Sequence, residues 1–288
     1  MGPGDAAVVG VVLAAGAGTR LRPLTLVRPK PLCPVGDRPL VDHAVARLQG
    51  VTADVAVNVH HGRDLLEPHV ASLGVHVSVE ESEALGTAGA LGRLRPWLDG
   101  RAVLVVNGDT WTDAPVAALL DGWDGERMRL LLAGRDGGGP RPKLCGALLP
   151  WAEVADLAPE PSGLWELRWA RAEAEGRLER LAVPAAFADC GTPAAYLAAN
   201  LAWHPAPADL AGRPDPASAG SAPLAPKGLP VAPTGSAQRP DGSVIGAGAT
   251  VDGSVERSVV WPGEAVGSGE RLFQAIRYGG GRTVIVRP

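Results

Sequence analysis

The sequence predicts an α/β protein, with a mixed, mostly parallel sheet between helices and a small β-solenoid after it. Three patterns favour this fold. Short apolar runs alternate with helix-period segments from Ala6 to about Asn107, polar residues follow these runs, and aliphatic residues recur mostly every sixth position after residue 243. We therefore expect a large domain over residues 1–203, a linker over 204–242 and the solenoid over 243–288.

The composition describes a globular protein rather than a disordered or membrane protein. The chain has 288 residues, of which 46% are hydrophobic, and a net charge of -4, so nothing favours a nucleic-acid-binding surface. Cys33, Cys145 and Cys190 are odd in number and lack the spacing of a disulfide framework or a zinc site. No signal peptide or apolar run of membrane length is present, and we expect a cytoplasmic protein.

The large domain begins with repeated strand and helix signals. Strands are predicted at residues 7–15, 54–59, 75–80 and 101–109, and helices at 38–50, 64–74 and 86–98. Pro39 and Gly50 mark the limits of the first helix, and Pro68 is expected to interrupt the second. The candidate polar sites follow strands, at the sheet edge where open α/β sheets bind ligands.

The second half of the chain is less regular. We expect strands at residues 129–134 and 143–149, an amphipathic helix over 161–178 that covers the sheet, and a closing segment at 187–203. The linker is dominated by Pro, Ala, Gly and Ser and has too few large apolar side chains to fold alone. The aliphatic residues expected to point into the solenoid are Ile245, Val251, Val260, Val266 and Leu272.

A glycine-rich bend follows the first predicted strand, in the stretch LAAGAGTRLRPLTLVRPKPL from Leu13 to Leu32. Backbone N–H groups in such a bend can surround an anion. A dinucleotide fingerprint would need a glycine where Leu21 stands, and a Walker loop would need Gly-Lys-Ser/Thr. Prolines stiffen the backbone that carries Arg20 and Lys30, which favours a bound polyphosphate over solvated charges.

The stretch LAAGAGTRLRPLTLVRPKPLCPVGDRPLVDHAV resembles the signature of the nucleotide-sugar pyrophosphorylases, which are NTP-dependent sugar-1-phosphate nucleotidyltransferases. VNVHHGRDLLEPHV, EALGTAGAL, VVNGD and FADCGTPAAYLAANL are similar to that family in the same order, and the tail resembles the short left-handed β-helix of its mannose-1-phosphate guanylyltransferase branch. The resemblance implies a Rossmann-like sheet. It also implies in-line attack of a sugar 1-phosphate on the α-phosphorus of an NTP, with release of pyrophosphate.

The resemblance assigns roles to the charged residues. Arg20 would attract the departing pyrophosphate, and Lys30 would steady the α-phosphate or the sugar phosphate. Asp109 and Asp189 would bind Mg²⁺, which would bridge donor and acceptor phosphates. Asp109 also ends a buried strand, where a carboxylate is costly unless it holds a cation. The triphosphate would be cradled by Leu13, Ala14, Gly16, Gly18 and Thr19.

The nucleoside is assigned to the stretch EALGTAGAL. Gly86, Thr87 and Ala88 would lie close to base and ribose, with Glu81 or Glu83 as a base contact. Without the resemblance, Gly86 and Thr87 equally well begin a helix. LGTAG resembles guanylyl and thymidylyl branches, whereas VNGDTWTD resembles muramate-phosphate uridylyltransferases, so the base stays open with GTP slightly favoured over UTP or dTTP.

The acceptor side departs from the family. Most members carry an E-K-P strand whose lysine grips the sugar phosphate, and this chain has GRDGGGPRPK instead, so Lys143 or Arg141 would substitute. Glu166 is a candidate sugar-hydroxyl contact, and Gly146 is either a point of sugar approach or a plain strand glycine. A silent paralogue that binds nucleotide sugars and regulates a partner is the alternative. A homo-oligomer through the solenoid is a further expectation.

Two pairs of aromatic residues receive a structural interpretation. His60 and His61 follow a strand, but an attacking phosphate has no proton to remove, so no general base is needed. We expect packing and a hydrogen bond near the strand end for both. Trp165 and Trp169 lie one helical turn apart and are expected to be core residues.

Overall fold

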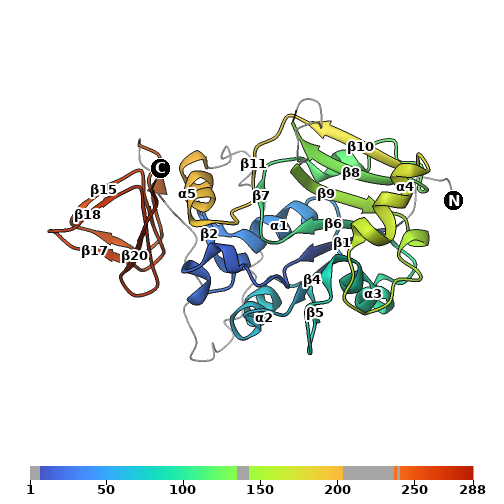
Figure 1. Ribbon diagram of the computed structural model, residues 1–288, viewed down its shortest axis with the longest axis horizontal. Helices are drawn as coiled ribbons and strands as arrows, with labels where there is room; N and C mark the ends of the chain where they lie inside the picture. Colours follow the sequence, from blue (N-terminus) through green and yellow to red (C-terminus); the bar gives the residue numbers. More distant parts are fainter. Residues whose placement is uncertain (1–6, 135–142, 204–236, 239–240, 288) are drawn as a thin grey trace. The chain divides into compact units, whose positions relative to one another are not determined.

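The computed structural model describes residues 7–134, 143–203, 237–238 and 241–287 (Figure 1). The chain divides into two compact units. The first contains 1–19, 28–32 and 40–189, and the second contains 20–27, 33–39 and 190–288. The domain limits proposed from the sequence stay a prediction, and most of the predicted linker lies outside the described residues.

A seven-stranded sheet of order β10-β8-β9-β6-β1-β4-β5 forms the first unit. Neighbours β1, β4, β5 and β6 are parallel, as are β8 and β10, whereas β9 runs antiparallel to β6 and β8. This confirms the mixed, mostly parallel sheet. Its strands are β1 (Val8–Leu13), β4 (Val55–Val59), β5 (His76–Val79), β6 (Ala102–Asn107), β8 (Met128–Ala133), β9 (Lys143–Leu149) and β10 (Leu178–Val183).

Two hydrophobic cores lie on opposite faces of this sheet, because successive strand residues point to opposite sides. Val12 and Val57 join one core together with α1 (Leu40–Gln49) and α2 (Arg63–Ser72). Val11 and Ala56 join the other, which α3 (Gly86–Leu98) and α4 (Ala170–Ala174) cover (Figure 1). A sheet buried on both faces explains the nearly continuous apolar runs.

Three expectations about helices are wrong in detail. The helix predicted over 161–178 is a π-helical turn, Trp165–Trp169, that continues into α4 and ends at Ala174, and Leu178 already begins strand β10. Helix α2 continues through Pro68, because buried Leu66 and Val70 hold it on the sheet on either side. Helix α1 begins at Leu40, since a hairpin of β2 (Pro34–Val35) and β3 (Arg38–Pro39) takes the residues before it.

Short elements complete the description. Strand β7 (Trp111–Thr112) pairs antiparallel with β11 (Phe187–Ala188). The 3₁₀ turns are Thr19–Leu21, Leu24–Leu26, Lys30–Leu32, Val116–Leu119 and Trp151–Glu153. None of the described helices is long and apolar enough to cross a membrane.

Helix α3 carries glycines on one side that a neighbouring segment approaches closely. A Cβ at Gly86, Gly89 or Gly92 would lie 2.5, 2.1 or 2.3 Å from a main-chain carbonyl oxygen of the segment 158–162. Such contacts are too short for any side chain. These glycines are therefore needed for packing between α3 and that segment.

Among the C-terminal strands of the second unit, each parallel pair joins a strand to the third strand along, and two antiparallel pairs join consecutive strands. Parallel pairs join β13 to β16, β16 to β19, β14 to β17 and β15 to β18, whereas β12–β13 and β19–β20 are antiparallel. Val260, Val266 and Leu272 are buried in one cluster, with Ile245 and Val251 packed against it, as predicted. The strands are β12 (Ala237–Gln238), β13 (Val244–Ile245), β14 (Thr250–Val251), β15 (Ser254–Glu256), β16 (Val259–Val260), β17 (Ala265–Val266), β18 (Arg271–Phe273), β19 (Ala275–Tyr278) and β20 (Arg282–Ile285).

A buried tyrosine connects three segments of the second unit. Tyr196, on α5 (Pro193–Ala202), donates its hydroxyl to the carbonyl oxygen of Pro34 and accepts a 2.9 Å hydrogen bond from Trp261 Nε1. Asn200, one turn later, accepts a 3.0 Å bond from the Gly36 amide. Helix α5 thereby holds together the β2–β3 hairpin and Trp261, the residue that directly follows strand β16.

Replacement of Gly89 by alanine tests whether packing or helix propensity has the larger effect on the stability of the protein at this position. Propensity alone would stabilise the variant by about 1 kcal/mol. The clash at 2.1 Å should instead lower the free energy of unfolding by about 1–3 kcal/mol, measured by urea denaturation. Gly16→Ala is the control, since a Cβ there meets nothing within 4 Å. A stabilised Gly89→Ala protein would contradict the contact.

Replacement of Tyr196 by phenylalanine should lower the free energy of unfolding by about 1–3 kcal/mol, because the buried hydrogen bonds of the Tyr196 hydroxyl with Trp261 and Pro34 are lost. Burial also raises the pKa of Tyr196 well above its ordinary value.

The raised pKa of Tyr196 makes stability depend on pH. The unfolded phenol ionises near pH 10, whereas the folded one stays neutral, so the contribution is complete below about pH 10 and is lost as the pH rises toward the folded pKa. The difference in melting temperature between wild type and Tyr196→Phe should therefore shrink in alkaline buffer. A constant difference would rule out this titration.

Candidate functional site

Four parallel strands of the first unit, β1, β4, β5 and β6, end at the same edge of the sheet. The chain leaves β6 beside the end of β1, where the Gly108 amide donates a 2.8 Å hydrogen bond to the Leu13 carbonyl. A Cβ at Gly108 would lie 2.8 Å from Val12 Cγ1, so only glycine allows this approach. It places Asp109 next to the start of the glycine-rich bend.

The glycine loop, residues 14–19, presents an open main chain. Gly16 and Thr19 are exposed, whereas Ala14 is buried where the loop leaves half-buried Leu13. Gly18 has φ +60°, which favours glycine, but a Cβ at Gly16 would meet nothing within 4 Å. The fold therefore needs a glycine at position 18 and leaves position 16 unconstrained.

Lys30 joins two aspartate-bearing segments that are far apart in the sequence. Its Nζ donates to Asp109 Oδ2 at 3.0 Å and to the main-chain oxygen of Asp189 at 2.6 Å. The lysine is only 5% exposed, so these oxygens compensate an ammonium that has lost most of its hydration. The structure thus brings Lys30, Asp109 and the main chain of Asp189 together, and their common role in the reaction stays a prediction.

Asp109 and Asp189 offer carboxylate oxygens of the kind that Mg²⁺ prefers, and a metal site there stays a prediction. Lys30 contacts only one oxygen of Asp109, whose side chain is 38% exposed, and Asp189 is exposed. No group of three His, Cys, Asp or Glu residues suited to a metal occurs in the described part of the chain. Mg²⁺ keeps several waters and needs only one or two carboxylates beside substrate phosphates, so this donor set fits it.

Two other predicted cations lie on different segments. Arg20 is exposed in the turn Thr19–Leu21 and begins the first segment of the second unit. Lys143 is exposed at the start of β9. Because β9 is antiparallel to β6, Lys143 lies at the sheet edge where Asn107 ends β6. Arg141 lies outside the described residues.

The predicted nucleoside segment packs against the residues that precede the π-helical turn. Helix α3 begins at Gly86, and the Thr87 hydroxyl accepts a 2.8 Å bond from the Leu164 amide. The amide of Ala88, which is buried, donates to Ser162 O at 3.0 Å. The interpretation as a helix start is confirmed, and a nucleoside contact stays a prediction.

The remaining acidic candidates are exposed. Glu81 forms a 2.9 Å ion pair with Arg63, and Glu83 is exposed beyond it. Glu166 is exposed in the π-helical turn, and its carboxylate lies over Gly163, where a Cβ would come within 1.9 Å of it.

Gly146 fits one of its two expected roles, whereas Trp165 does not lie where it was expected. Gly146 is buried in β9, with Val106 and Leu119 within 3.4 and 3.6 Å of an added Cβ, which favours the plain strand glycine. Trp165 is 46% exposed, so its expected place in the core is wrong, whereas Trp169 packs against the second core. The wider π turn explains this, because residues four apart no longer share one face.

Sequence reasoning missed Asn58 and Glu80, which are each only 2% exposed at the ends of β4 and β5. The one signal was a polar residue inside or directly after a buried apolar run. Both histidines form the predicted contact near a strand end, but only His60 is partly buried as expected, whereas His61 is exposed. His60 Nδ1 lies 2.7 Å from the Glu80 carbonyl oxygen, and His61 Nδ1 lies 2.9 Å from that of Ala15.

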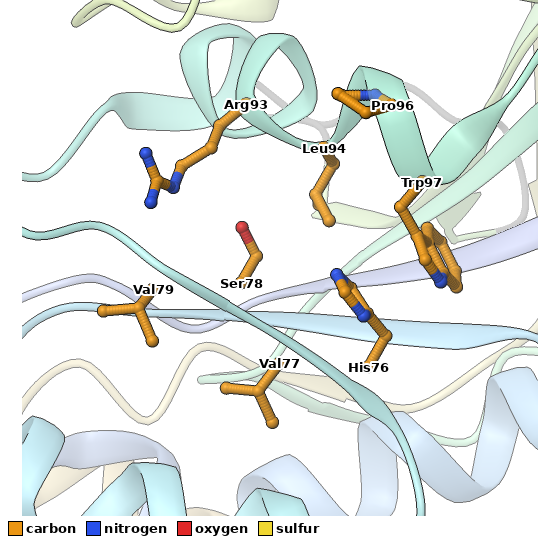
Figure 2. A pocket seen from close by; sticks show the side chains of 8 residues that line it. All are labelled: His76, Val77, Ser78, Val79, Arg93, Leu94, Pro96 and Trp97. Carbon is orange, nitrogen blue, oxygen red and sulfur yellow. The ribbon is translucent and has the colours of Figure 1, made fainter.

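A cavity of about 340 Å³ lies between β5 and α3 (Figure 2). His76 and Trp97 stack at one end of it, with ring centroids 5.1 Å apart, and Arg93 lies at the other. None of the candidate residues lines this cavity, so the strand ends around the glycine loop remain the candidate site.

Comparison with known proteins identifies relatives. Residues 10–203 match the family described as the MobA-like NTP transferase domain. The N-acetylmuramate alpha-1-phosphate uridylyltransferase of Caulobacter vibrioides is 38% identical over 136 residues, which are 43% of this chain and 56% of that protein. The mannose-1-phosphate guanyltransferase of Debaryomyces hansenii is 41% identical over 122 residues, 39% of this chain and 33% of that protein.

The matched segment spans a third to just over half of these two relatives. Among solved structures, a putative glucose-1-phosphate thymidylyltransferase from Bacillus anthracis in complex with a sucrose has a TM-score of 0.55 at 21% identity. The alignment covers 67% of this chain and 94% of that one, and it supports the fold.

The Lys30–Asp109 pair should be energetically coupled. We expect a double-mutant cycle of Lys30→Met and Asp109→Ala, measured by denaturant unfolding, to give a coupling energy of about 1–2 kcal/mol. This value lies between those typical of exposed and of fully buried ion pairs, because Lys30 is buried and Asp109 is partly exposed. The exposed Arg171–Glu175 pair is the control and should show far less coupling. Additive effects at Lys30 and Asp109 would show that the two charges do not stabilise each other.

Proposed function

The chain belongs to the MobA-like NTP transferase domain family, and from this premise we propose that it transfers a nucleotidyl group from an NTP to a sugar 1-phosphate. The products are an NDP-sugar and pyrophosphate. The observation that carries the proposal is the Lys30 ammonium, held by Asp109 and by Asp189 O in the unit that also contains the open glycine loop.

The reaction brings two anionic phosphates together, so the protein must position them and offset their repulsion. The main chain at Gly16 and Gly18 and the Thr19 hydroxyl would donate hydrogen bonds to the triphosphate. Lys30 would place its charge at the reacting phosphates, and Arg20 would attract the pyrophosphate. No side chain has to remove a proton, because the attacking phosphate oxygen is already an anion.

Magnesium would be held by Asp109 and Asp189. The chemistry that the ion would supply there is positive charge, which would offset the repulsion between the phosphates. Asp109 can serve both Lys30 and a metal, because the lysine uses one carboxylate oxygen and leaves the other exposed to a ligand.

The nucleobase and sugar are proposed from weaker features. GTP is slightly favoured by the LGTAG stretch at residues 85–89, and UTP or dTTP, with sugar 1-phosphates that include the N-acetylmuramate type, is the alternative. The two relatives described above are named for the transfer of different nucleotides, uridylyl and guanylyl, so their names do not favour one NTP over the other. Lys143, at the sheet edge, would take the part of the absent E-K-P lysine, and Glu166 would contact sugar hydroxyls.

The C-terminal strands are proposed to form a short β-solenoid of the left-handed type that contributes to a homo-oligomer. Their parallel pairing at intervals of 15 to 17 residues, as in Val244 with Val259 and Val259 with Ile276, supports stacked coils. A catalytically silent binding paralogue is the alternative function. Retention of Lys30 with both aspartates favours the enzyme, since a silent relative would not need this costly buried charge.

Pyrophosphate release tests the function directly. The full chain would be incubated with Mg²⁺, each of four NTPs and a panel of sugar 1-phosphates. We expect release in a subset of pairs and its loss in Asp109→Ala. Nucleotide binding without release in any pair would support the silent paralogue.

Substitution of Gly16 separates ligand approach from folding. Alanine fits the empty space around position 16, so stability should not change. A methyl group in the phosphate cradle should raise the KM for the NTP on the order of tenfold or more. Gly269→Ala, where a Cβ also meets nothing within 4 Å, is the control for activity. Unchanged kinetics in Gly16→Ala would place the triphosphate elsewhere.

A further inference from the structure

A chain of three buried hydrogen bonds connects the glycine loop to the start of α3. The Ala14 amide donates to Asn58 Oδ1 at 2.7 Å, and Asn58 Nδ2 donates to Glu80 Oε1 at 2.7 Å. The Leu85 amide donates to Glu80 Oε2 at 2.8 Å. We call these four residues the strand-end relay, because its two side chains lie where β4 and β5 end.

The relay has a direction that dictates its chemistry. A main-chain N–H points into it from each end, so its two side chains must accept at both ends and still bond to each other. Two amide side chains would each accept one N–H and then face each other with NH₂ groups, which both donate. One member must therefore accept only, and the carboxylate of Glu80 fills this role.

Packing alone does not account for a carboxylate at position 80, because burying this group is destabilising unless it is compensated. Glu80 is 2% exposed, and no cation within the described residues forms an ion pair with it. Burial of a charge costs free energy that only good hydrogen bonds offset. Both oxygens of Glu80 are bonded, one to Asn58 and one to the Leu85 amide, so the cost of burying this side chain is offset only while the relay is complete.

The two ends of the relay adjoin the two segments assigned to the NTP. Ala14 opens the glycine loop, and Leu85 directly precedes Gly86 at the start of α3. We propose that Asn58 and Glu80 are positioning residues that fix these two segments at the separation one NTP requires. This inference rests on the proposed function, because it assumes that one segment holds the triphosphate and the other the nucleoside.

Exchanging the amide of Asn58 and the carboxylate of Glu80 between the two positions tests the relay. Glu80→Gln sets two NH₂ groups against each other, and Asn58→Asp sets two carboxylates against each other. The double variant Asn58→Asp/Glu80→Gln restores all three bonds. Its new carboxylate accepts from the Ala14 amide and from the new carboxamide, whose oxygen accepts from the Leu85 amide. The double variant also keeps one negative charge.

We expect each single variant to raise the KM for the NTP by about ten- to a hundredfold, with a smaller effect on the KM of the sugar 1-phosphate. The double variant should return to near the wild-type value. Glu126→Gln, an exposed substitution of the same chemistry, is the control and should change nothing. Single variants with wild-type KM, or a double variant no better than the singles, would overturn the proposal.

Hydrogen exchange separates this inference from the proposed function. In the ligand-free protein the amides of Ala14 and Leu85 should be protected, lose protection together in Glu80→Gln and regain it in the double variant. Unchanged protection in Glu80→Gln would overturn the relay whatever the enzyme does. Absence of transfer and of any NTP-induced rise in melting temperature in the wild type would instead refute the proposed function. If a single variant fails to fold, folding of the double variant supports the relay.

Discussion

One buried ammonium group organises the candidate site. Lys30 has lost nearly all of its contact with water, and it needs oxygen partners that lie in fixed positions. The chain supplies them from two distant places, the carboxylate of Asp109 after β6 and the main chain at Asp189 after β11. The cost of desolvating one charge thereby brings two acidic segments to the same point, and the site inherits its geometry from that requirement.

Buried polar groups that need hydrogen-bond partners also determine the structure at the ends of the parallel strands. Where β1, β4 and β5 end, the sheet ladder no longer supplies partners, and side chains take over that role. Asn58 and Glu80 complete the bonds of the Ala14 and Leu85 amides, and His60 and His61 approach the carbonyls of Glu80 and Ala15. A sheet edge suited to bind a ligand is also one whose main chain must be held in place.

Much of the fold could be predicted from periodicity, because both faces of the sheet are buried and its strands are continuous apolar runs. The glycine loop, Lys30 and the two aspartates could be found through the resemblance. The register of β9, the strand at Leu178 and the exposure of Trp165 could not. They depend on tertiary pairing and on a π turn, which no local pattern encodes. Glu80 was overlooked because a buried carboxylate resembles an ordinary polar residue after a strand.

The second unit is not an appendage joined at a single point. It includes the segments 20–27 and 33–39, and the hairpin in the latter is bonded to α5 through Tyr196 and Asn200. Recombination at one crossover near residue 190 would therefore combine a foreign C-terminal segment with a hairpin that does not match it. Chimeras between relatives should carry both N-terminal segments along with the tail, and evolution of the two parts is expected to be correlated for the same reason.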